Sequence, residues 1–276
     1  MDTAHKKTKA AKWIVAIILA IGGILMVLPF IWMVLSSLKT DTEIMQFPPT
    51  ILPQDPTMDN FKELFSAFHF FVYFKNTMII VICSFGGLFL NAMAGFGFAK
   101  YKFKGKNFLF YLVLATMMIP GQVTMIPVYL ILNAMGLTNT MAGIVLPGLV
   151  GAFGIFLFRQ FMSTISNEMF EAARLDGASE WKIFWRIVLP VSRPVLAVQG
   201  ILTFIGAWNS FLWPLIVAND EKYYTLSIGL QLLKGQYASN YALQMAGSTF
   251  MIIPIIIVFL VFQKYILQGF NVSGMK

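Results

Sequence analysis

The chain has 276 residues, of which 58% are hydrophobic and 12% are charged. Soluble domains contain about 45–50% apolar and about 25% charged residues, so this composition excludes an ordinary soluble domain and indicates a membrane protein. The single cysteine, Cys83, excludes an intramolecular disulfide and a metal site built from several cysteines. The formal net charge is +8. The positions of the basic residues indicate whether this charge faces a nucleic acid or the membrane.

Long uncharged segments predict an all-α membrane protein with six transmembrane helices. A hydrocarbon core about 30 Å thick requires about 20 apolar residues in a helix. The first run, 13–38, contains 26 uncharged residues. It exceeds the apolar region of about 7–15 residues in a signal peptide, which favours an uncleaved first span. The other runs are 77–99 with an amphipathic lead-in at 70–74, 108–132, 141–158, 195–218 and 242–262.

These runs divide the chain into a first transmembrane helix at 13–38 and a five-helix core at 73–266. A short tail at 1–12 precedes the first helix, a loop at 39–72 follows it, and a second tail occupies 267–276. The largest polar segment within the core is 165–190, between the fourth and fifth runs.

The basic residues predict the orientation of the chain. With the N-terminus in the cytoplasm, fifteen of the twenty Lys and Arg residues fall on the cytoplasmic side, as the positive-inside rule requires. Both termini and the segment 165–190 are then cytoplasmic. The charge therefore requires no nucleic acid, and the lysines before the first span are expected to meet anionic membrane lipid. The five remaining basic residues are then on the extracytoplasmic side of the membrane: Lys39, Lys62, Lys75, Lys222 and Lys234.

The chain contains no evident source of energy for transport. The six span cores lack Asp, Glu, Lys, Arg and His, although carriers that act alone usually place ionisable groups at membrane depth. The phosphate-binding pattern G-x4-G-K-[ST] is also missing from the sequence. We therefore expect a transport subunit that binds no cofactor or metal of its own and is driven by another protein.

Two alternatives belong to other classes. Backbone carbonyls can still hold a sodium ion, so an ion-coupled secondary carrier acting without an ATPase remains open. An intramembrane enzyme is disfavoured because His5 and His69 lie outside the span cores and no paired carboxylates lie within them, so we expect no catalytic residue.

The segment 165–190 predicts a helix, a turn and a second helix. Residues 167–175 are good helix formers, and Gly177 tolerates the positive φ that follows many helices. Ser179 is a suitable N-cap for a second helix that we expect to end near Pro190. Phe170 and Leu175 are candidate apolar anchors for a partner, whereas an amphipathic helix lying on the membrane surface is the alternative.

The same segment carries the pattern E-A-A-x3-G-x9-I-x-L-P, which begins at Glu171 and ends at Pro190. In this pattern the chain resembles the membrane subunits of ABC importers. The sequences at 118–122, 146–148, 207–209 and 211–215 narrow the resemblance to carbohydrate permeases of the maltose-permease type. Two departures are Ser166, which stands where the family usually has proline, and the tail at 271–276, which follows the family only in part.

The resemblance implies a function and a set of partners. It implies a permease subunit that imports a sugar, with a di- or oligosaccharide preferred, across the cytoplasmic membrane. The implied partners are a homologous second permease, a dimer of ABC ATPases that uses ATP and Mg, and an extracytoplasmic sugar-binding protein. The residues implied to dock onto the ATPase are Phe170, Glu171, Ala172, Ala173, Arg174, Leu175, Asp176, Gly177 and Ala178.

Polar residues at membrane depth are candidates for the translocation path, because an unsatisfied polar group in hydrocarbon is costly. Amides beside aromatic rings suit a sugar, but they equally suit helix packing and an interfacial aromatic belt. Both interpretations stay open for Asn91, Gln122, Trp208, Asn209, Ser210, Trp213 and Gln244.

Small residues and prolines predict features of helix packing. Glycines and alanines near the end of the second run and in the fourth are expected to pack helices closely. Four prolines are expected to kink their helices: Pro120, Pro127, Pro214 and Pro254.

Overall fold

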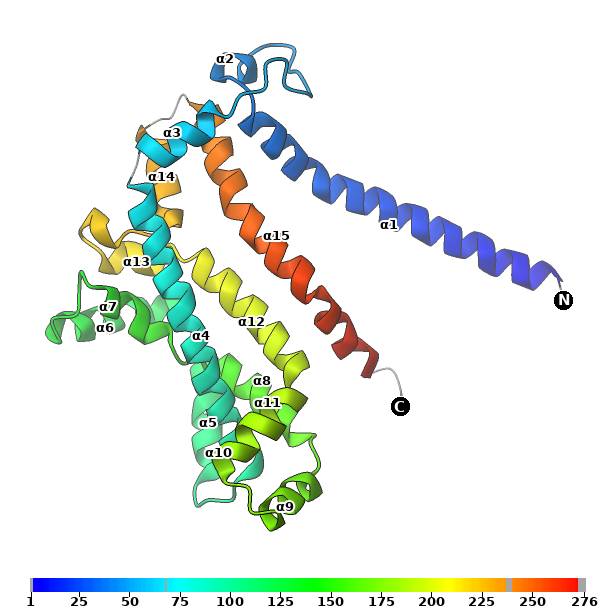
Figure 1. Cartoon of the computed structure of the whole chain (residues 1–276), viewed down its shortest axis with the longest axis vertical. Helices are drawn as coiled ribbons and strands as arrows, with labels where there is room; N and C mark the ends of the chain where they lie inside the picture. Colours follow the sequence, from blue (N-terminus) through cyan, green and yellow to red (C-terminus); the bar gives the residue numbers. More distant parts are fainter. Residues whose placement is uncertain (1, 68, 237–239, 273–276) are drawn as a thin grey trace. The chain divides into compact units, whose positions relative to one another are not determined.

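The computed structural model describes residues 2–67, 69–236 and 240–272, and within these ranges every regular element is helical (Figure 1). The all-α prediction is confirmed. Residues 273–276 of the predicted C-terminal tail lie outside the described ranges. The chain forms two compact units, residues 1–68 with 230–253, and residues 69–229 with 254–276.

Five segments within the described ranges are long and apolar enough to cross a membrane. They are Ala11–Ser37, Phe70–Lys100, Met141–Ser163, Arg193–Val217 and Tyr241–Lys264. Helices α5 (Lys106–Thr116) and α6 (Gly121–Ala134) make a sixth candidate only as a pair, since they are bent by 102° at the break between them.

The run predicted as the third span, 108–132, is thus broken next to Pro120, one of the prolines expected to kink its helix. Pro120 has φ −58° and ψ 130°, outside the helical region, and immediately precedes α6. Proline disfavours the helical conformation in the residue before it and cannot donate a backbone hydrogen bond, which explains a break at this point. Pro127 and Pro254, by contrast, lie inside α6 and α15.

The fourth and fifth predicted spans are also interrupted. The fourth consists of α7 (Met141–Val145), the 3-10 turn η1 (Leu146–Gly148) and α8 (Ala152–Ser163). The fifth consists of α12 (Arg193–Trp208) and α13 (Leu212–Val217). Pro214 lies in the first turn of α13, where the backbone N–H has no partner within the helix and a proline is tolerated.

The first unit contains α1 (Asp2–Ser37), α2 (Asp41–Ile44), α3 (Asp59–Ala67) and the adjoining parts of α14 (Leu226–Gln236) and α15 (Tyr241–Val272). The side-chain amide of Asn60 donates to the carbonyl oxygens of Ser37 and Lys39, each at 2.8 Å. The backbone N–H of Tyr241 donates to Oδ1 of Asp41 at 2.8 Å. Short helices and specific hydrogen bonds therefore order residues 39–67 of the predicted loop 39–72, whose last residues begin α4.

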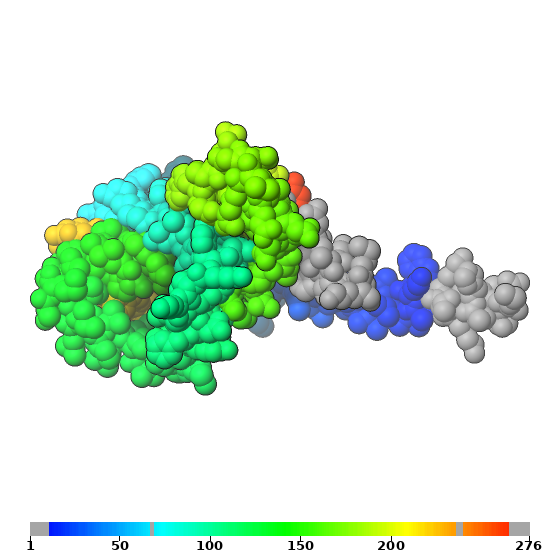
Figure 2. All heavy atoms as spheres, turned by 90° about the horizontal axis from the view of Figure 1, so that it is seen from below, coloured from blue at the N-terminus to red at the C-terminus, as the bar shows by residue number. Residues whose placement is uncertain are grey.

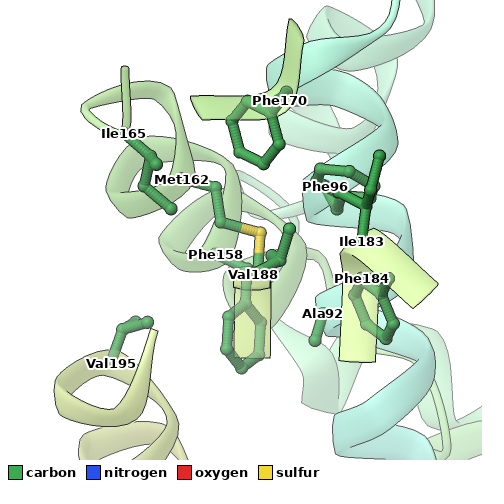
Figure 3. Packing of buried hydrophobic residues seen from close by; sticks show 10 residues of the cluster. All are labelled: Ala92, Phe96, Phe158, Met162, Ile165, Phe170, Ile183, Phe184, Val188 and Val195. Carbon is green, nitrogen blue, oxygen red and sulfur yellow. The ribbon is translucent and has the colours of Figure 1, made fainter. Parts of the chain in front are cut away.

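The second unit is organised around α4 (Phe70–Lys100), which packs against both α8 and α12. A cluster of buried apolar side chains closes one end of this packing (Figure 3). At the other end of α4, the side-chain amide of Asn76 donates to the carbonyl oxygens of Lys222 and Tyr224, beside the short 3-10 helix η3 (Glu221–Tyr223).

The small residues of α4 and the fourth span have two different roles. A Cβ at Gly95 would lie 2.5 Å from Cβ of Phe158, and one at Gly154 would lie 2.9 Å from Nδ2 of Asn91, which confirms close helix packing at these positions. At Gly97, Gly148 and Gly151, by contrast, an added Cβ would meet no atom of this chain within 4 Å, so the chain itself makes no close helix contact there.

The second helical run of the segment 165–190 ends at Val191, one residue past Pro190 and close to the expected end. Helix α10 (Glu180–Ile183) continues through a π-helical turn, η2 (Phe184–Val188), into α11 (Leu189–Val191), and the chain then passes through Ser192 into α12. A π turn shifts the hydrogen bonding by one residue, which is one way to carry a helix past the missing N–H of Pro190.

We expect Gly95→Ala to lower the thermal stability of the chain in detergent, because the new Cβ would also lie 2.9 Å from the backbone nitrogen of Arg159. Overpacking of this kind costs about 1–3 kcal/mol. Gly97→Ala, two residues along the same helix, is the matched control. Thermal unfolding followed by tryptophan fluorescence should show a lower midpoint for Gly95→Ala alone, and equal midpoints would contradict the packing of α4 on α8.

Candidate functional site

The segment predicted to dock onto an ATPase forms α9 (Asn167–Leu175), with the bounds expected from the sequence. The hydroxyl of Ser166 accepts a hydrogen bond from the N–H of Glu168 at 3.2 Å and caps the start of the helix. Serine as N-cap thus supplies the helix start at the position where the resembled family usually has proline.

Helix α9 ends in a Schellman motif. The N–H of Ala178 donates to the carbonyl of Ala173 at 2.9 Å, and the N–H of Gly177 donates to the carbonyl of Arg174 at 3.0 Å. Gly177 has φ +74°, which confirms the turn expected there and explains why glycine is suited to it. Ser179 then accepts from the N–H of Lys182 and caps α10, also as expected.

The inner face of α9 is attached to the end of α4. The Phe170 ring is only 2% exposed and lies 5.9 Å from the ring of Phe96, within the apolar cluster of Figure 3. Lys100, the last residue of α4, donates to the carbonyl of Ile165 and to Oδ1 of Asn167 at 3.0 Å. These contacts fix both the position and the rotation of α9.

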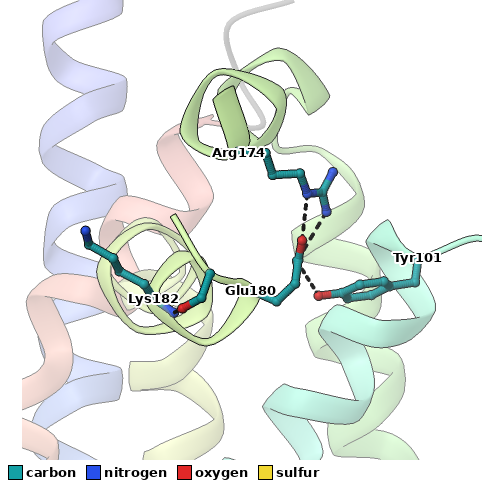
Figure 4. A network of polar contacts seen from close by, with 5 residues as sticks. Tyr101, Arg174, Glu180 and Lys182 are labelled. Atoms are coloured by element: carbon teal, nitrogen blue, oxygen red, sulfur yellow. Dashed lines mark hydrogen bonds and ion pairs between the residues drawn. The ribbon is translucent and has the colours of Figure 1, made fainter. Parts of the chain in front are cut away.

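A polar network forms a second attachment (Figure 4). Nε of Arg174 donates to Oε1 of Glu180 at 2.7 Å, and the Tyr101 hydroxyl donates to Oε2 at 2.5 Å. The hydrogen bonds from Arg174 and Tyr101 lower the pKa of Glu180. Burial and the neighbouring carboxylate raise the pKa of Tyr101 to about 12. The network therefore joins α9, α10 and the end of α4.

The outer face of α9 is open to solvent. Glu168, Glu171, Ala172 and Leu175 are all exposed and follow the i, i+3, i+4, i+7 spacing of one helix face. Leu175 is 89% exposed. Figure 2, in which these residues are yellow-green, shows the segment at the surface. We call these four residues the outer face of α9.

The expected docking residues divide between these two faces. Arg174, Asp176 and Gly177 are exposed with the outer face, while Ala173 and Ala178 are half-buried. Phe170 was expected as an apolar anchor for a partner, but the structure buries it in the chain's own core. Of the two predicted anchors, only Leu175 is presented at the surface.

The second unit also contains a cavity of about 580 Å³. Its walls come from α4, α6, α12 and the interrupted segment from α7 to α8. Three predicted path residues line it, namely Asn91, Ser210 and Trp213. Nε1 of Trp213 donates to the carbonyl of Ile144 at 3.1 Å, and Oδ1 of Asn91 accepts from the N–H of Gly151 at 3.0 Å, so both side chains are held in place.

The other predicted path residues do not line this cavity. Trp208 is 1% exposed, and its ring stacks on Phe204 at 5.8 Å and meets Phe74 edge-on, which makes it a packing residue of the core. Asn209 is exposed at the break between α12 and α13, and neither Gln122 nor Gln244 belongs to the lining.

Four polar residues of the cavity wall were missed by the sequence reasoning: Ser84, Thr124, Gln199 and Thr203. Gln199 and Thr203 are one helical turn apart and lie on the same face as Gly206 and Ser210. This polar and small-residue spacing along the fifth span was the signal that could have identified them.

Residues 87–272 match the family model described as "Binding-protein-dependent transport system inner membrane component". The chain belongs to this family. It is 37% identical to the arabinooligosaccharides transport system permease protein AraQ of Halalkalibacterium halodurans, over 99% of each chain. It is 30% identical to the sn-glycerol-3-phosphate transport system permease protein UgpE of Brucella abortus, over 92% of this chain and 93% of the relative.

The fold is also similar to that of a chain in the crystal structure of a bacterial ABC transporter that imports the acidic polysaccharide alginate. The TM-score is 0.83 at 24% identity, over 94% of this chain and 98% of the other. Membership of the family makes the chain a multi-pass permease component of an ABC importer rather than an enzyme. None of the comparisons supports the ion-coupled carrier.

We expect Glu180→Gln to loosen α9, because the neutral amide loses the charged interaction with Arg174. Exposed ion pairs contribute about 0.2–1 kcal/mol, so hydrogen exchange in residues 167–175 should become roughly two- to fivefold faster. Glu168→Gln is the matched control, since Glu168 is exposed on the same helix and none of the described salt bridges includes it.

The contact between Glu180 and Arg174 makes the local stability of α9 depend on pH. The pKa of Glu180 is lowered in the folded chain. The stabilisation of α9 by ionised Glu180 is therefore complete above the ordinary pKa of 4.5 and is lost as the pH falls through the lowered pKa. After correction for intrinsic exchange rates, the wild type and Glu180→Gln should differ at pH 7 and converge in acid. An identical difference at both pH values would contradict this account.

Proposed function

We propose that the chain is one of two permease subunits of an ABC importer that carries a sugar, with a di- or oligosaccharide preferred, across the cytoplasmic membrane. The observation that carries this proposal is α9, which is anchored on its inner face and open on its outer face. A helix built in this way can transmit force from a partner that binds the outer face.

The proposal includes a topology. The bent pair α5 and α6 counts as one span, giving six spans in all, with both termini and the coupling helix α9 in the cytoplasm. The distribution of Lys and Arg supports this orientation. Along the sequence, the proposed parts of the chain are a first transmembrane helix at 13–38, an extracytoplasmic loop at 39–72 and a transmembrane domain at 73–266. The coupling segment within this domain is 165–190.

The proposed partners follow from the family. They are a homologous second permease, a dimer of ABC ATPases that binds ATP and Mg, and an extracytoplasmic sugar-binding protein. The match to a binding-protein-dependent family supports the last of these. This chain itself binds no cofactor, and lipid surrounds its spans.

The attachments of α9 define a route for coupling. Phe170, Lys100 and the Tyr101 network join α9 to α4, while α10, η2 and α11 lead through Ser192 into α12. Both α4 and α12 line the cavity. Closure of the ATPases would therefore move two walls of the cavity through contiguous packing, and the spans would follow as a rigid body between inward-open and outward-open states.

We expect Gly177→Val to lower sugar uptake and uncouple it from ATP hydrolysis, because a β-branched residue is strained at φ +74° and shifts the turn after α9. Gly136→Val is the matched control. Gly136 has φ +68° and, like Gly177, no atom within 4 Å of an added Cβ, but it follows α6 rather than α9. Uptake and ATP hydrolysis in liposomes measure the effect, and normal coupling in Gly177→Val would refute the proposed role of the turn.

Purification of the tagged chain from gently solubilised native membranes tests the function itself. We expect an ATPase, a second permease and a sugar-binding protein to copurify, and one sugar of a panel to stimulate ATP hydrolysis. Uptake by the purified chain alone, driven by an ion gradient without ATP, would instead establish the secondary carrier.

A further inference from the structure

The short loop between α4 and α5 carries a dense positive charge. Every second position at this junction is a lysine: Lys100, Lys102, Lys104 and Lys106. The sequence contains no Asp or Glu from residue 64 to residue 167, so the loop has no acidic neighbour along the chain. The loop itself is only residues 101–105, and an extended chain spans at most about 3.6 Å per residue. The lysines therefore stay close to the ends of two apolar helices, at the level of the lipid headgroups.

Two of these lysines are engaged within the chain and two are free. Nζ of Lys100 donates to the segment that begins α9, and Nζ of Lys106 donates to the carbonyl of Tyr101 at 2.9 Å. Lys102 and Lys104 are exposed, and within the described ranges neither has a hydrogen bond or a salt bridge. Their charges are available to a partner outside the chain.

Neighbouring elements do not neutralise the loop. On α8, the guanidinium carbon of Arg159 lies 3.8 Å from the centre of the Phe110 ring, and its positive charge repels that of Lys106. Nε of Arg159 has no hydrogen-bond partner among the described residues. Glu180, the carboxylate that hydrogen-bonds to this loop, is already paired with Arg174 at 2.7 Å. The loop is thus an uncompensated positive surface that attracts an anion.

The loop and the start of α5 form an open hollow of about 350 Å³. Lys102 and Lys106 line it together with Phe103 and Phe108, whereas Lys104 does not. The two phenylalanines are 44% and 66% exposed. Cations beside exposed apolar rings suit a molecule that is both anionic and apolar. A soluble anion would gain nothing from the rings, whereas a phospholipid brings its phosphate to the lysines and its acyl chain to the rings.

We propose that this hollow binds an anionic phospholipid of the cytoplasmic leaflet, with the phosphate at Lys102 and Lys106 and the upper part of an acyl chain against Phe103 and Phe108. Anionic lipids in that leaflet attract basic residues beside a span. Lipid binding at this loop is independent of the solute and of the ATPase, and only the choice of leaflet rests on the proposed topology.

Direct binding tests the site. The complete importer, purified in a neutral detergent and stripped of lipid, is incubated with phosphatidylglycerol or with phosphatidylcholine of the same acyl chains. Native mass spectrometry counts the lipid retained, and the difference between wild type and variant isolates this site from lipid bound elsewhere. The wild type should retain phosphatidylglycerol in preference. Lys102→Gln should lower the affinity for phosphatidylglycerol about fivefold, the effect of one lysine on an anionic headgroup, and leave phosphatidylcholine unchanged.

Matched variants make the result specific. Lys104→Gln removes the same charge from the same loop, but Lys104 does not line the hollow, so retention should equal that of the wild type. Phe108→Ala changes no charge and should still weaken retention, which provides a second test if Lys102→Gln does not assemble. Its control is Tyr111→Ala, because Tyr111 is 65% exposed on the next turn of α5 and lies outside the lining.

Different failures would exclude different parts of this site. Equal losses in Lys102→Gln and Lys104→Gln would show diffuse attraction to charge rather than a site. Displacement of the lipid by inorganic phosphate, with retention unchanged in Phe108→Ala, would identify a site for a free anion. Loss of the ATPase from purified Lys102→Gln, with lipid retention unchanged, would show that the hollow binds a partner protein instead.

Discussion

The packing of Phe170 against Phe96 is the contact on which the position of α9 and its exposed outer face depends. Because this ring enters the apolar cluster at the end of α4, α9 can lie in only one rotation, with Leu175 and Glu171 outward. The charged network at Glu180 adds a second attachment, but an exposed ion pair contributes far less than a buried aromatic ring. Apolar burial therefore sets the geometry of α9, and the ion pair refines it.

Interrupted helices have a related role within the spans. The breaks at 117–120, 149–151 and 209–211 all occur in segments that contribute to the cavity wall. Irregular backbone at membrane depth is tolerated where it lines a cavity or is buried in protein, since its polar groups must find partners there. Here the side chain of Asn91 accepts from the N–H of Gly151, and the indole of Trp213 donates to the carbonyl of Ile144. Side chains therefore make hydrogen bonds to backbone groups at or near the interruption of the helix.

The proposed coupling segment and the cavity are connected through α12. Its first residue follows the segment that begins at α10, and its polar face with Gln199 and Thr203 forms part of the cavity. In the proposed function, movement of the segment from α9 to α11 would therefore act directly on one wall of the cavity. This arrangement requires no long chain of intermediates between the two sites, because one helix belongs to both.

The sequence by itself determined the features that depend on local energetics. Long uncharged runs identified apolar helices, the residues from Asn167 to Leu175 identified α9, and Gly177 identified the turn after it, since each follows from residue type and neighbours along the chain. The tertiary structure decided the rest. It showed that α5 and α6 are bent by 102° at their break, that Phe170 faces inward, that Trp208 belongs to the core and that Gln199 lines the cavity. These outcomes depend on which helix faces meet, and that choice is made by packing between residues far apart in the sequence, which local periodicity does not encode.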